Sequence, residues 1–372
     1  MVDVEILVVG GGPAGLSAAK AAASLGATVV VCERDEMPGG QLVKQTHKFF
    51  GSEKQCAGER GIHIGQKLLA DVRADKNITL LTDAAAIGMY EDGVVGLLHH
   101  GMFVKYRPKR LIIATGASEK FLAFNGNDLP GIYGAGAVQT LMNVAGVKPA
   151  ERVLMVGSGN IGLIVSYQLK QAGVEVAAVI EAAPKIGGYL VHASKIRRAG
   201  IPILTGWTIC EAYGDGQVEG ARICRLDEKW QPIPGTVRDV KCDVICLAVG
   251  LSPLTELCWQ AECEMKFVRE LSGHVPVTDR NLETTHKGIY ASGDVSGIEE
   301  ASSAMVEGKL AGYAAAESLG YGSDRAAALK EKARSELDEL RAGPMGAKIR
   351  QGIETMESKG GKVHVNLDRY SC

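Results

Sequence analysis

A glycine-rich turn between two apolar runs constrains the fold of this chain more than any other stretch. Residues 6–9 form an apolar run that predicts a strand buried on both faces, and the GxGxxG motif of Gly10, Gly12 and Gly15 follows it. Gly10 permits the tight turn into an Ala-rich helix, Gly12 lets a pyrophosphate approach the backbone, and Gly15 lets helix and strand pack closely. A second apolar run ends at Glu33, where an acid accepts ribose hydroxyls. Because the N–H groups at a helix start attract phosphates, this stretch predicts half of a dinucleotide-binding unit.

The same plan occurs again 147 or 148 residues later. A strand-like run from Arg152 leads into a second GxGxxG motif, made by Gly157, Gly159 and Gly162, and the next strand-like run ends at Glu181. A Gly-Gly pair follows the terminal acid in both copies. A repeat of this length indicates a duplicated domain rather than a solenoid. Two nucleotide sites are therefore expected.

The positions of the two copies predict an α/β fold with two Rossmann-like domains, one inserted into the other. Residues 1–118 and 259–320 are expected to form a discontinuous first domain, and residues 119–258 an inserted second domain of NAD(P) type. Residues 321–372 are charged and helical in pattern and are expected to form a short C-terminal tail.

The tail contains one apolar stripe among its charges. At helical spacing the stripe consists of Ala326, Ala327, Leu329, Ala333, Leu337 and Leu340. Such a stripe buries itself against another surface. Two interpretations follow: the stripe attaches the chain to another subunit, or it folds back on the first domain.

Charge and hydropathy restrict the partners of the chain. The formal net charge is −2 with no basic block, so a nucleic acid or an anionic membrane surface is not an expected partner. No apolar stretch reaches the length of a membrane-spanning helix, and Asp3 and Glu5 stand where a signal peptide would be basic. A cytoplasmic location is expected.

The cysteines favour reduced, buried thiols over a disulfide framework. There are nine, an odd number, scattered through apolar strand-like segments, and no CxxC motif occurs. Cys242, Cys246, Cys258 and Cys263 form the only cluster in the sequence. Because their spacings match no common zinc or iron–sulfur pattern, no metal site is expected.

Four motifs in order carry a resemblance to a known superfamily. GGGPAG with Glu33, ATGAS at 114–118, GSGNIG at 157–162 and ASGDVSG at 291–297 together resemble the two-dinucleotide-domain flavoproteins of the glutathione and thioredoxin reductase superfamily. The likeness covers residues 4 to about 320 and implies FAD in the first domain. It implies NAD(H) or an adenine nucleotide in the second.

The resemblance also assigns site residues. Those assigned to FAD are Gly10, Gly12, Pro13, Ala14, Gly15, Glu33, Arg34, Gly40, Gln41, Ala114, Thr115, Gly116, Gly293 and Asp294. Those assigned to the second nucleotide are Gly157, Gly159, Asn160, Ile161, Gly162 and Glu181. In this likeness the helix after Asp294 lies below the flavin ring.

Two departures and two further stretches indicate the branch of the superfamily. Without a CxxC motif, dithiol exchange of the thioredoxin reductase kind is excluded, and Leu163 and Ile164 stand where pyridine-nucleotide reductases often carry a Glu. Residues 124–160 and 339–350 resemble the FAD-bearing alpha subunits of bacterial heteromeric dehydrogenases, such as hydrogen cyanide synthase, opine, hydroxyproline and L-proline dehydrogenases and heterotetrameric sarcosine oxidase. This likeness implies a flavin-dependent catalytic partner subunit, together with a small iron–sulfur subunit.

The first copy carries about 25 more residues than the second after its Gly-Gly pair. Extra length in a repeat tends to map to a functional face. The insertion is either a solvated surface excursion or a wall of the redox centre. In the second case Gln41, Lys44 and His47 are the flavin-facing candidates, since a positive side chain favours a reduced anionic flavin. Phe49 and Phe50 lie in the same insertion.

Three functions remain open at this point. The first is an FAD-dependent oxidoreductase that transfers electrons as one subunit of an amine or amino-acid dehydrogenase. The second is a stand-alone NADH-dependent flavin reductase of a small acceptor. The third is a nucleotide-binding scaffold subunit. The fold itself does not choose among them.

Overall fold

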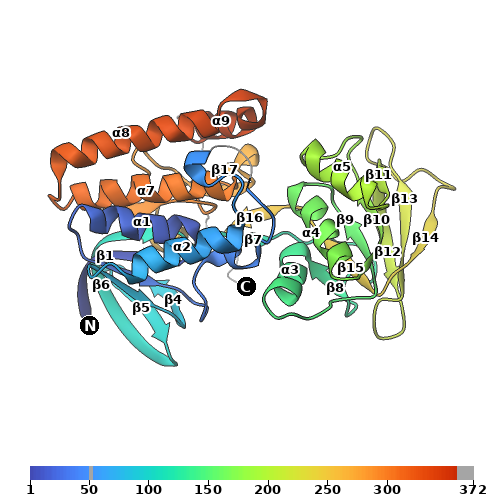
Figure 1. Ribbon diagram of the computed structural model, residues 1–372, viewed down its shortest axis with the longest axis horizontal. Helices are drawn as coiled ribbons and strands as arrows, with labels where there is room; N and C mark the ends of the chain where they lie inside the picture. The colour runs from blue at the N-terminus through green and yellow to red at the C-terminus, as the bar shows by residue number, and fades with distance from the viewer. Residues whose placement is uncertain (50–52, 358–372) are drawn as a thin grey trace, which may run out of the picture. The chain divides into compact units, whose positions relative to one another are not determined.

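The computed structural model describes residues 1–49 and 53–357, and the chain divides into two compact units (Figure 1). The first unit consists of Met1–Ser118 and the chain from Ser252 onward, and the second is Glu119–Leu251. The return to the first unit comes earlier than the expected residue 259, because Leu257 and Cys258 pack in the core of the first unit. The α/β fold class predicted from the sequence is confirmed.

A parallel sheet forms the centre of the first unit, in the strand order β3, β2, β1, β6 and β19. The strands are Val2–Val9 (β1), Val29–Cys32 (β2), Ile78–Leu81 (β3), Met102–Ile113 (β6) and Ile289–Ala291 (β19). Ile6 and Val8 of β1 are fully buried on one face, and Leu7 is fully buried on the other. Burial on both faces explains why this strand is a continuous apolar run.

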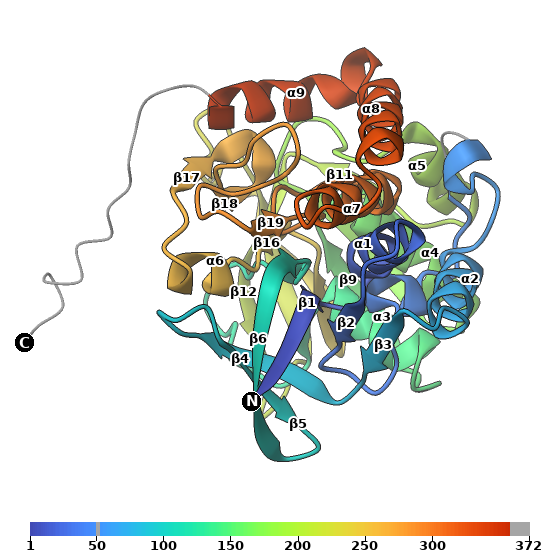
Figure 2. The same cartoon turned by 90° about the vertical axis from the view of Figure 1, so that its left-hand side faces the viewer.

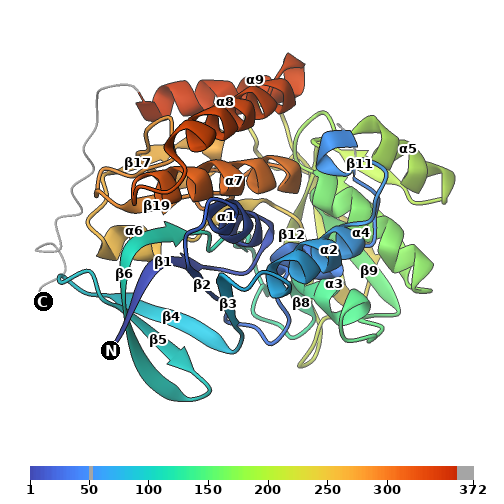
Figure 3. The ribbon, with the colours of Figure 1, turned by 60° about the vertical axis from the view of Figure 1, so that its left-hand side comes forward.

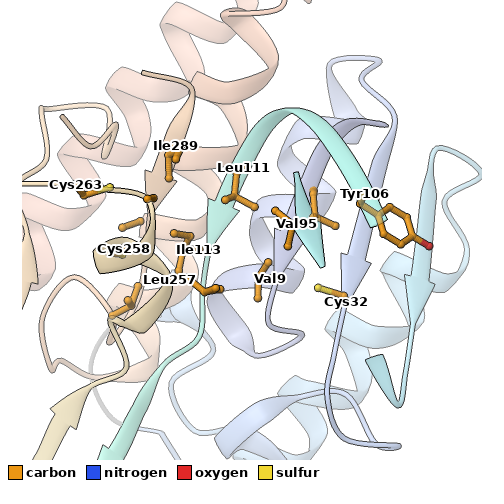
Figure 4. Close-up of a cluster of buried hydrophobic side chains, with 14 of the residues drawn as sticks. Val9, Cys32, Val95, Tyr106, Leu111, Ile113, Leu257, Cys258, Cys263 and Ile289 are labelled. Carbon is orange, nitrogen blue, oxygen red and sulfur yellow. The ribbon is translucent and has the colours of Figure 1, made fainter. Parts of the chain in front are cut away.

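Two antiparallel strands, β4 (Ala84–Met89) and β5 (Val95–His99), extend the same sheet from β6 (Figure 3). Strand β6 therefore has two roles: its first residues pair with β5, and residues 106–113 pair with β1. Figure 4 shows the core between these strands, with Val9, Cys32 and Val95 close together.

Two helices cover the face of the parallel strands that carries Ile6 and Val8. Helix α1 (Pro13–Ser24) packs against α7 (Ala301–Glu317), and Figure 2 shows α7 between α1 and α8. A Cβ atom on Gly308 would lie 2.1 Å from the carbonyl oxygen of Ala14, and one on Gly312 would lie 2.2 Å from that of Ala18. Glycines four residues apart on one helix face therefore allow the two backbones to touch.

The insertion of the first copy follows the second strand of the unit. It forms the short 3-10 helices η1 (Gly40–Lys44) and η2 (Glu53–Gln55) before helix α2 (Gly61–Arg73). Leu42 and Phe49 of the insertion are buried together with Met305 of α7, whereas Phe50 lies outside the described residues.

The C-terminal segment folds back on the first unit. Helix α8 (Ser323–Leu340) buries Ala333 and Leu337 against Val306 and Leu310 of α7. The second interpretation of the apolar stripe is therefore confirmed for Ala333 and Leu337, whereas Ala327 of the same stripe is exposed.

Helix α9 (Gly343–Glu357) extends the same segment over another part of the first unit. Its Ile349, Ile353 and Met356 pack against β17 (Met265–Val268), η3 (Arg269–Leu271) and β18 (Gly273–Pro276). The remaining short elements are α6 (Glu256–Gln260) and the strands at the two crossings between the units, β7 (Ala117–Glu119) and β16 (Leu251–Pro253).

The second unit repeats the plan of the first. Its parallel sheet has the order β11, β10, β9, β15 and β8, beside an antiparallel sheet of β12, β13 and β14. The bounds are Ile132–Gly134 (β8), Ala135–Asn143 (α3), Arg152–Val156 (β9), Asn160–Gln171 (α4), Glu175–Glu181 (β10), Leu190–Arg198 (α5), Ile203–Thr205 (β11), Trp207–Tyr213 (β12), Gly220–Arg225 (β13), Arg238–Lys241 (β14) and Val244–Leu247 (β15). Together β14 and β15 correspond to the single long strand β6. They are separated at Asp243, whose carboxylate accepts hydrogen bonds from the backbone N–H groups of Glu151 and Arg152, both at 2.7 Å.

Five of the described cysteines are the reduced, buried thiols that the sequence predicts, and Cys56 is a free thiol that is half-buried. Cys32, Cys242, Cys246, Cys258 and Cys263 are buried free thiols. Cys210 and Cys224, however, form a disulfide, which contradicts the expectation of reduced thiols at these two positions. The two cysteines lie on the paired antiparallel strands β12 and β13, where Thr208, two residues before Cys210, stands opposite Cys224. Cys210 therefore lies diagonally across from Cys224, with 6.5 Å between their Cα atoms.

Across residues 1–49 and 53–357, no helix combines the length and the apolar character needed to span a membrane.

Candidate functional site

The outer two glycines of the first fingerprint are required by the fold itself. Gly10 has a φ of +108°, and a Cβ atom there would lie 2.3 Å from the carbonyl oxygen of Ala114. A Cβ atom on Gly15 would lie 1.8 Å from the carbonyl oxygen of Gly10. Any side chain at either position would therefore collide with backbone that cannot move away.

The middle glycine is not constrained in this way. A Cβ atom on Gly12 would meet only the Cα atom of Gly40, at an ordinary contact distance of 3.7 Å. Gly12 is the N-cap of α1, and no side chain caps this helix start among the described residues. The start of α1 thus presents backbone N–H groups and the positive end of the helix dipole, a donor set that fits the pyrophosphate of a dinucleotide.

Glu33 stands beside this helix start. Its Oε2 atom accepts a hydrogen bond from the backbone N–H of Gly11 at 2.8 Å, and its Oε1 atom accepts one from the N–H of Asp35 at 2.9 Å. The residue is 6% exposed. Two backbone donors therefore hold the carboxylate at the end of β2, where a ribose hydroxyl can donate to it. The neighbouring Arg34 is exposed.

Three motifs that are distant in sequence meet at the start of α1. Ala14 of the fingerprint, Ala114 of the ATG motif and Ala304 of α7 form one buried cluster. A Cβ atom on Gly293, where φ is +79°, would lie 2.8 Å from the Cβ atom of Ala14. The hydroxyl of Thr115, next to Gly116, donates to the carbonyl oxygen of Leu254 at 2.7 Å. Ala14, Ala114 and Gly293, which the resemblance assigns to FAD, are therefore brought together at the start of α1.

Asp294 follows Gly293 in this cluster. Burial, reinforced by the carboxylates of Glu307 and Glu299, raises the pKa of its side chain to about 7. Its Oδ1 atom accepts one long hydrogen bond of 3.4 Å, from the backbone N–H of Glu299. A carboxyl group so weakly satisfied fits a position that accepts hydrogen bonds from a ligand hydroxyl.

The flavin-facing candidates lie on the insertion. Gln41 is exposed, whereas Lys44 and His47 are half-buried. Because Leu42 and Phe49 pack with Met305, the insertion lies against the first turns of α7. This placement agrees with a wall of the redox centre, and the flavin-facing role of the three side chains stays a prediction.

In the second fingerprint too, the outer glycines are required by close backbone contacts and the middle glycine is not. A Cβ atom on Gly157 would lie 2.3 Å from the carbonyl oxygen of Ala248, and one on Gly162 would lie 2.2 Å from that of Gly157. A Cβ atom on Gly159, the middle glycine, would meet no atom within 4 Å. The second unit therefore also keeps its middle glycine for a reason other than its own packing.

A serine distinguishes the second acid from the first. Glu181 Oε2 accepts hydrogen bonds from the backbone N–H of Ser158 at 3.0 Å and from its hydroxyl at 2.7 Å, and the same hydroxyl accepts one from the N–H of Gly187 at 3.2 Å. Asn160 Oδ1 accepts a hydrogen bond from the N–H of Tyr189 at 2.8 Å. These bonds hold the Gly187–Tyr189 turn against the start of α4, where Ile161 is exposed.

Sequence reasoning missed the charged residues behind Asp294. Glu299, Glu307 and Arg341 form a buried ion cluster there. A Glu among the small and apolar residues of the first turns of α7 was a usable signal for Glu307, but no local pattern links it to Arg341. Among the described residues, no group of three His, Cys, Asp or Glu side chains is placed to hold a metal ion.

Comparison with known sequences identifies relatives over most of the chain. The family model described as pyridine nucleotide-disulphide oxidoreductase matches residues 4–308. The opine oxidase A-type subunit of Agrobacterium tumefaciens is 28% identical over 345 residues, which are 89% of this chain and 69% of that protein. The HcnB subunit of hydrogen cyanide synthase from Pseudomonas aeruginosa is 28% identical over 83% of this chain and 70% of its own length. The alpha subunit of sarcosine oxidase from Corynebacterium is 27% identical over 86% of this chain, but the match covers 33% of that protein.

Solved structures share the fold. L-proline dehydrogenase from P. horikoshii superposes with a TM-score of 0.70 at 23% identity, over 90% of this chain and 59% of that one. Thioredoxin reductase from T. acidophilum gives a TM-score of 0.70 at 22% identity, over 86% of this chain and 99% of that one. The family model over residues 4–308 confirms the resemblance inferred from the four motifs.

Proposed function

The chain belongs to the pyridine nucleotide-disulphide oxidoreductase family, and we propose that it is the FAD-bearing, electron-transferring subunit of a multi-subunit amine or amino-acid dehydrogenase. Its sequence relatives include proteins named as subunits of opine oxidase, hydrogen cyanide synthase and sarcosine oxidase. Two partners complete this proposal: one is a flavin-dependent catalytic subunit, and the other is a small iron–sulfur subunit.

The observation that carries the proposal is the cluster of Ala14, Ala114 and Ala304 at the start of α1. The fingerprint, the ATG motif and the helix after Asp294 meet there. They lie beside Gly12, where the fold leaves room for a Cβ atom. In the proposal, the backbone N–H groups of α1 bind the pyrophosphate of FAD, and Glu33 accepts its ribose hydroxyls. Bound FAD supplies the electron-transfer chemistry.

The described free thiols of the first unit, Cys32, Cys56, Cys258 and Cys263, support the proposal of an electron partner outside the chain. Burial raises the pKa of the Cys32 thiol to about 12, and burial is also the main cause that raises the pKa of Cys56, Cys258 and Cys263. Because the thiolate is the reactive form, these side chains are poor nucleophiles for a dithiol relay. The sequence contains no CxxC motif either.

The test is isolation of the untagged complex from its native source, followed by identification of the co-purifying chains and of released flavin. The proposal expects stoichiometric FAD in this chain and at least one additional flavoprotein subunit that oxidises an amine or amino acid. A full-length chain isolated alone that turns over NADH with a small acceptor at about 1–10³ per second would contradict it.

The second unit gives specific support to a second candidate, a stand-alone NADH-dependent reductase. Glu181 ends β10 as Glu33 ends β2, so a carboxylate stands where it would accept both ribose hydroxyls and repel a 2′-phosphate. This candidate expects rapid flavin bleaching by NADH and slower bleaching by NADPH in a stopped-flow experiment. If neither nucleotide bleaches the flavin, this candidate is rejected, and the multi-subunit proposal and the scaffold function remain. An adenine nucleotide released when the protein is denatured would identify the resident ligand of the second unit.

A further inference from the structure

A buried glutamate holds the turn that precedes Asp294. Glu307 Oε2 accepts a hydrogen bond from the backbone N–H of Gly293 at 2.8 Å. It also lies 3.3 Å from the hydroxyl of Ser296, which donates to the carbonyl oxygen of Gly293 at 2.8 Å. Glu307 lies on α7 and is 6% exposed. Because the turn carries Asp294, the position of the Asp294 carboxyl depends on where Glu307 is held.

Arg341 supplies the positive charge that pairs with Glu307 and Glu299. Its guanidinium pairs with Glu307 Oε1, and its Nη2 atom lies 2.7 Å from Glu299 Oε1. The Nε atom also donates to Glu299 Oε1 at 2.9 Å. The arginine side chain is 14% exposed, and those of Glu299 and Glu307 are 11% and 8% exposed. Removing the arginine would leave two carboxylates in a site that water cannot fully solvate.

The C-terminal segment carries Arg341 to this place. The residue follows the last turn of α8, which is fixed on α7 by Ala333 and Leu337. Arg350 of α9 then donates hydrogen bonds to the carbonyl oxygens of Arg341 and Gly343. Both helices of the segment therefore fix the backbone from which the guanidinium extends.

The same segment also contacts the insertion. Gln55, which is 4% exposed, donates through Nε2 to Glu336 Oε2 at 3.2 Å. Lys54 forms an exposed ion pair of 3.0 Å with Glu339 one turn later. Helix α8 therefore contacts both the insertion and, through Arg341, the turn before Asp294.

We infer that the C-terminal segment completes the flavin site, with Arg341 acting as a positioning residue that fixes the Gly293–Asp294 turn through Glu307 and balances the carboxylates behind it. This inference rests on the proposed binding of FAD by the first unit. A buried negative charge near the flavin opposes the arrival of electrons, so the charge of this cluster affects the flavin reduction potential as well as flavin affinity.

Other charged groups face the same cluster. A cavity of about 170 Å³ next to the ion cluster is lined by the charged side chains of Asp279, Arg280, Arg334, Asp338 and Glu357, together with those of Glu299, Glu307 and Arg341. Arg334 donates to Asn281 Oδ1 at 2.6 Å, to Glu331 Oε2 at 3.0 Å and to the carbonyl oxygen of Arg280 at 3.2 Å, so each of its three nitrogens has a partner other than Glu307. Arg341 remains the arginine that neutralises the two glutamates.

The experiment compares full-length variants that change the net charge of the ion cluster in opposite directions. FAD affinity and the flavin midpoint potential are measured for the wild type, Arg341→Gln, Glu307→Gln and Arg341→Lys. Arg341→Gln is expected to weaken FAD binding about tenfold or more and to lower the potential. Glu307→Gln keeps an acceptor for Gly293 but removes a negative charge, so it is expected to raise the potential. Arg341→Lys keeps the charge and is expected to restore the potential.

The opposite signs separate a charge effect from damage to the fold, which would not shift the two potentials in opposite directions. Asp324→Asn, which removes an exposed carboxylate in the first turn of the same helix, is the matched control and is expected to match the wild type. If Arg341→Gln does not fold, Glu307→Gln decides alone, and a potential that is unchanged or lowered overturns the inference. If the wild type binds FAD and all the variants match it, the inference also fails. A wild-type chain that binds no FAD instead overturns the proposed function.

Discussion

The two fingerprints of the chain begin alike and are supported differently. In both, the outer glycines are enforced by backbone collisions, and the middle glycines Gly12 and Gly159 have room for a Cβ atom. Helix α1 of the first unit is covered by α7, whose Gly308 and Gly312 contact the backbone of α1. Helix α4 of the second unit instead packs beside α3 and α5. The first unit adds the Asp294 turn and its ion cluster, and the second adds the hydroxyl of Ser158.

This difference separates what the duplicated fold requires from what each ligand requires. Features shared by both copies, such as the collisions at Gly15 and Gly162, belong to the strand–turn–helix unit. Features of one copy alone reflect the group that copy binds. By this reasoning we propose that the acid cluster and the C-terminal helices serve the proposed flavin site, and that the Ser158–Glu181 contact serves the proposed second nucleotide.

The largest expected effect is loss of folding at the third glycine of either fingerprint. In Gly15→Ala the new Cβ atom would lie 1.8 Å from the carbonyl oxygen of Gly10, and in Gly162→Ala 2.2 Å from that of Gly157. Each substitution should lower the free energy of unfolding by about 3 kcal/mol or more, measured by thermal and urea denaturation. Gly159→Ala, which has no neighbour within 4 Å, is the control. If Gly15→Ala were as stable as the control, the collision with the carbonyl oxygen of Gly10 would not explain why glycine is needed there.

The middle glycines should give selective loss of ligand without loss of stability. Gly12→Ala places a methyl group where the pyrophosphate of FAD is proposed to lie, and Gly159→Ala does the same in the second unit. We expect Gly12→Ala to lower FAD affinity about 100-fold with a melting temperature near that of the apo wild type, since one lost close approach costs about 3 kcal/mol. Gly159→Ala should keep its FAD, measured by flavin absorbance after gel filtration. Loss of FAD in both variants would mean that the two sites are not independent.

The sequence could predict these glycines because each is part of a local pattern. Gly10, Gly12, Gly15 and Glu33 follow one another in one strand–turn–helix–strand unit, and the repetition of that unit revealed the inserted domain. Local spacing and internal repetition are properties that a single sequence contains.

The parts that could not be predicted depend on contacts between distant segments. The stripe of α8 is apolar enough to bury itself against either another protein or the chain itself, and only the surface of α7 decides which. Arg341 pairs with Glu299 and Glu307, yet no periodicity connects these positions. The disulfide between Cys210 and Cys224 depends on the register between β12 and β13, which the spacing of the two cysteines does not indicate.

An intermediate effect is expected from pH, through an acid placed in the first unit. The pKa of Asp294 is raised from 3.8 to about 7, so the folded state keeps this proton at pH values where the unfolded chain has released it. Its contribution to stability is therefore present at low pH and is lost as pH rises from about 4 to about 7. Between pH 5 and pH 8 the apo protein should lose about 2 kcal/mol of unfolding free energy that Asp294→Asn does not lose. Parallel pH profiles for the two proteins would contradict this account.

The smallest expected effect concerns Ser158, the residue by which the second site departs from the first. Its hydroxyl donates to Glu181 and accepts from the N–H of Gly187, so Ser158→Ala removes two hydrogen bonds that shape the second cradle. At about 1 kcal/mol of net loss, affinity for ADP or NAD⁺ should fall about fivefold by isothermal titration calorimetry, with FAD content unchanged. Ser166→Ala is the matched control, because Ser166 lies in the following helix α4 and its hydroxyl donates to the carbonyl oxygen of Gly162 within that helix at 2.7 Å. A fall in FAD content, or equal effects of the two substitutions on nucleotide affinity, would show that Ser158 does not set the second site apart from the first.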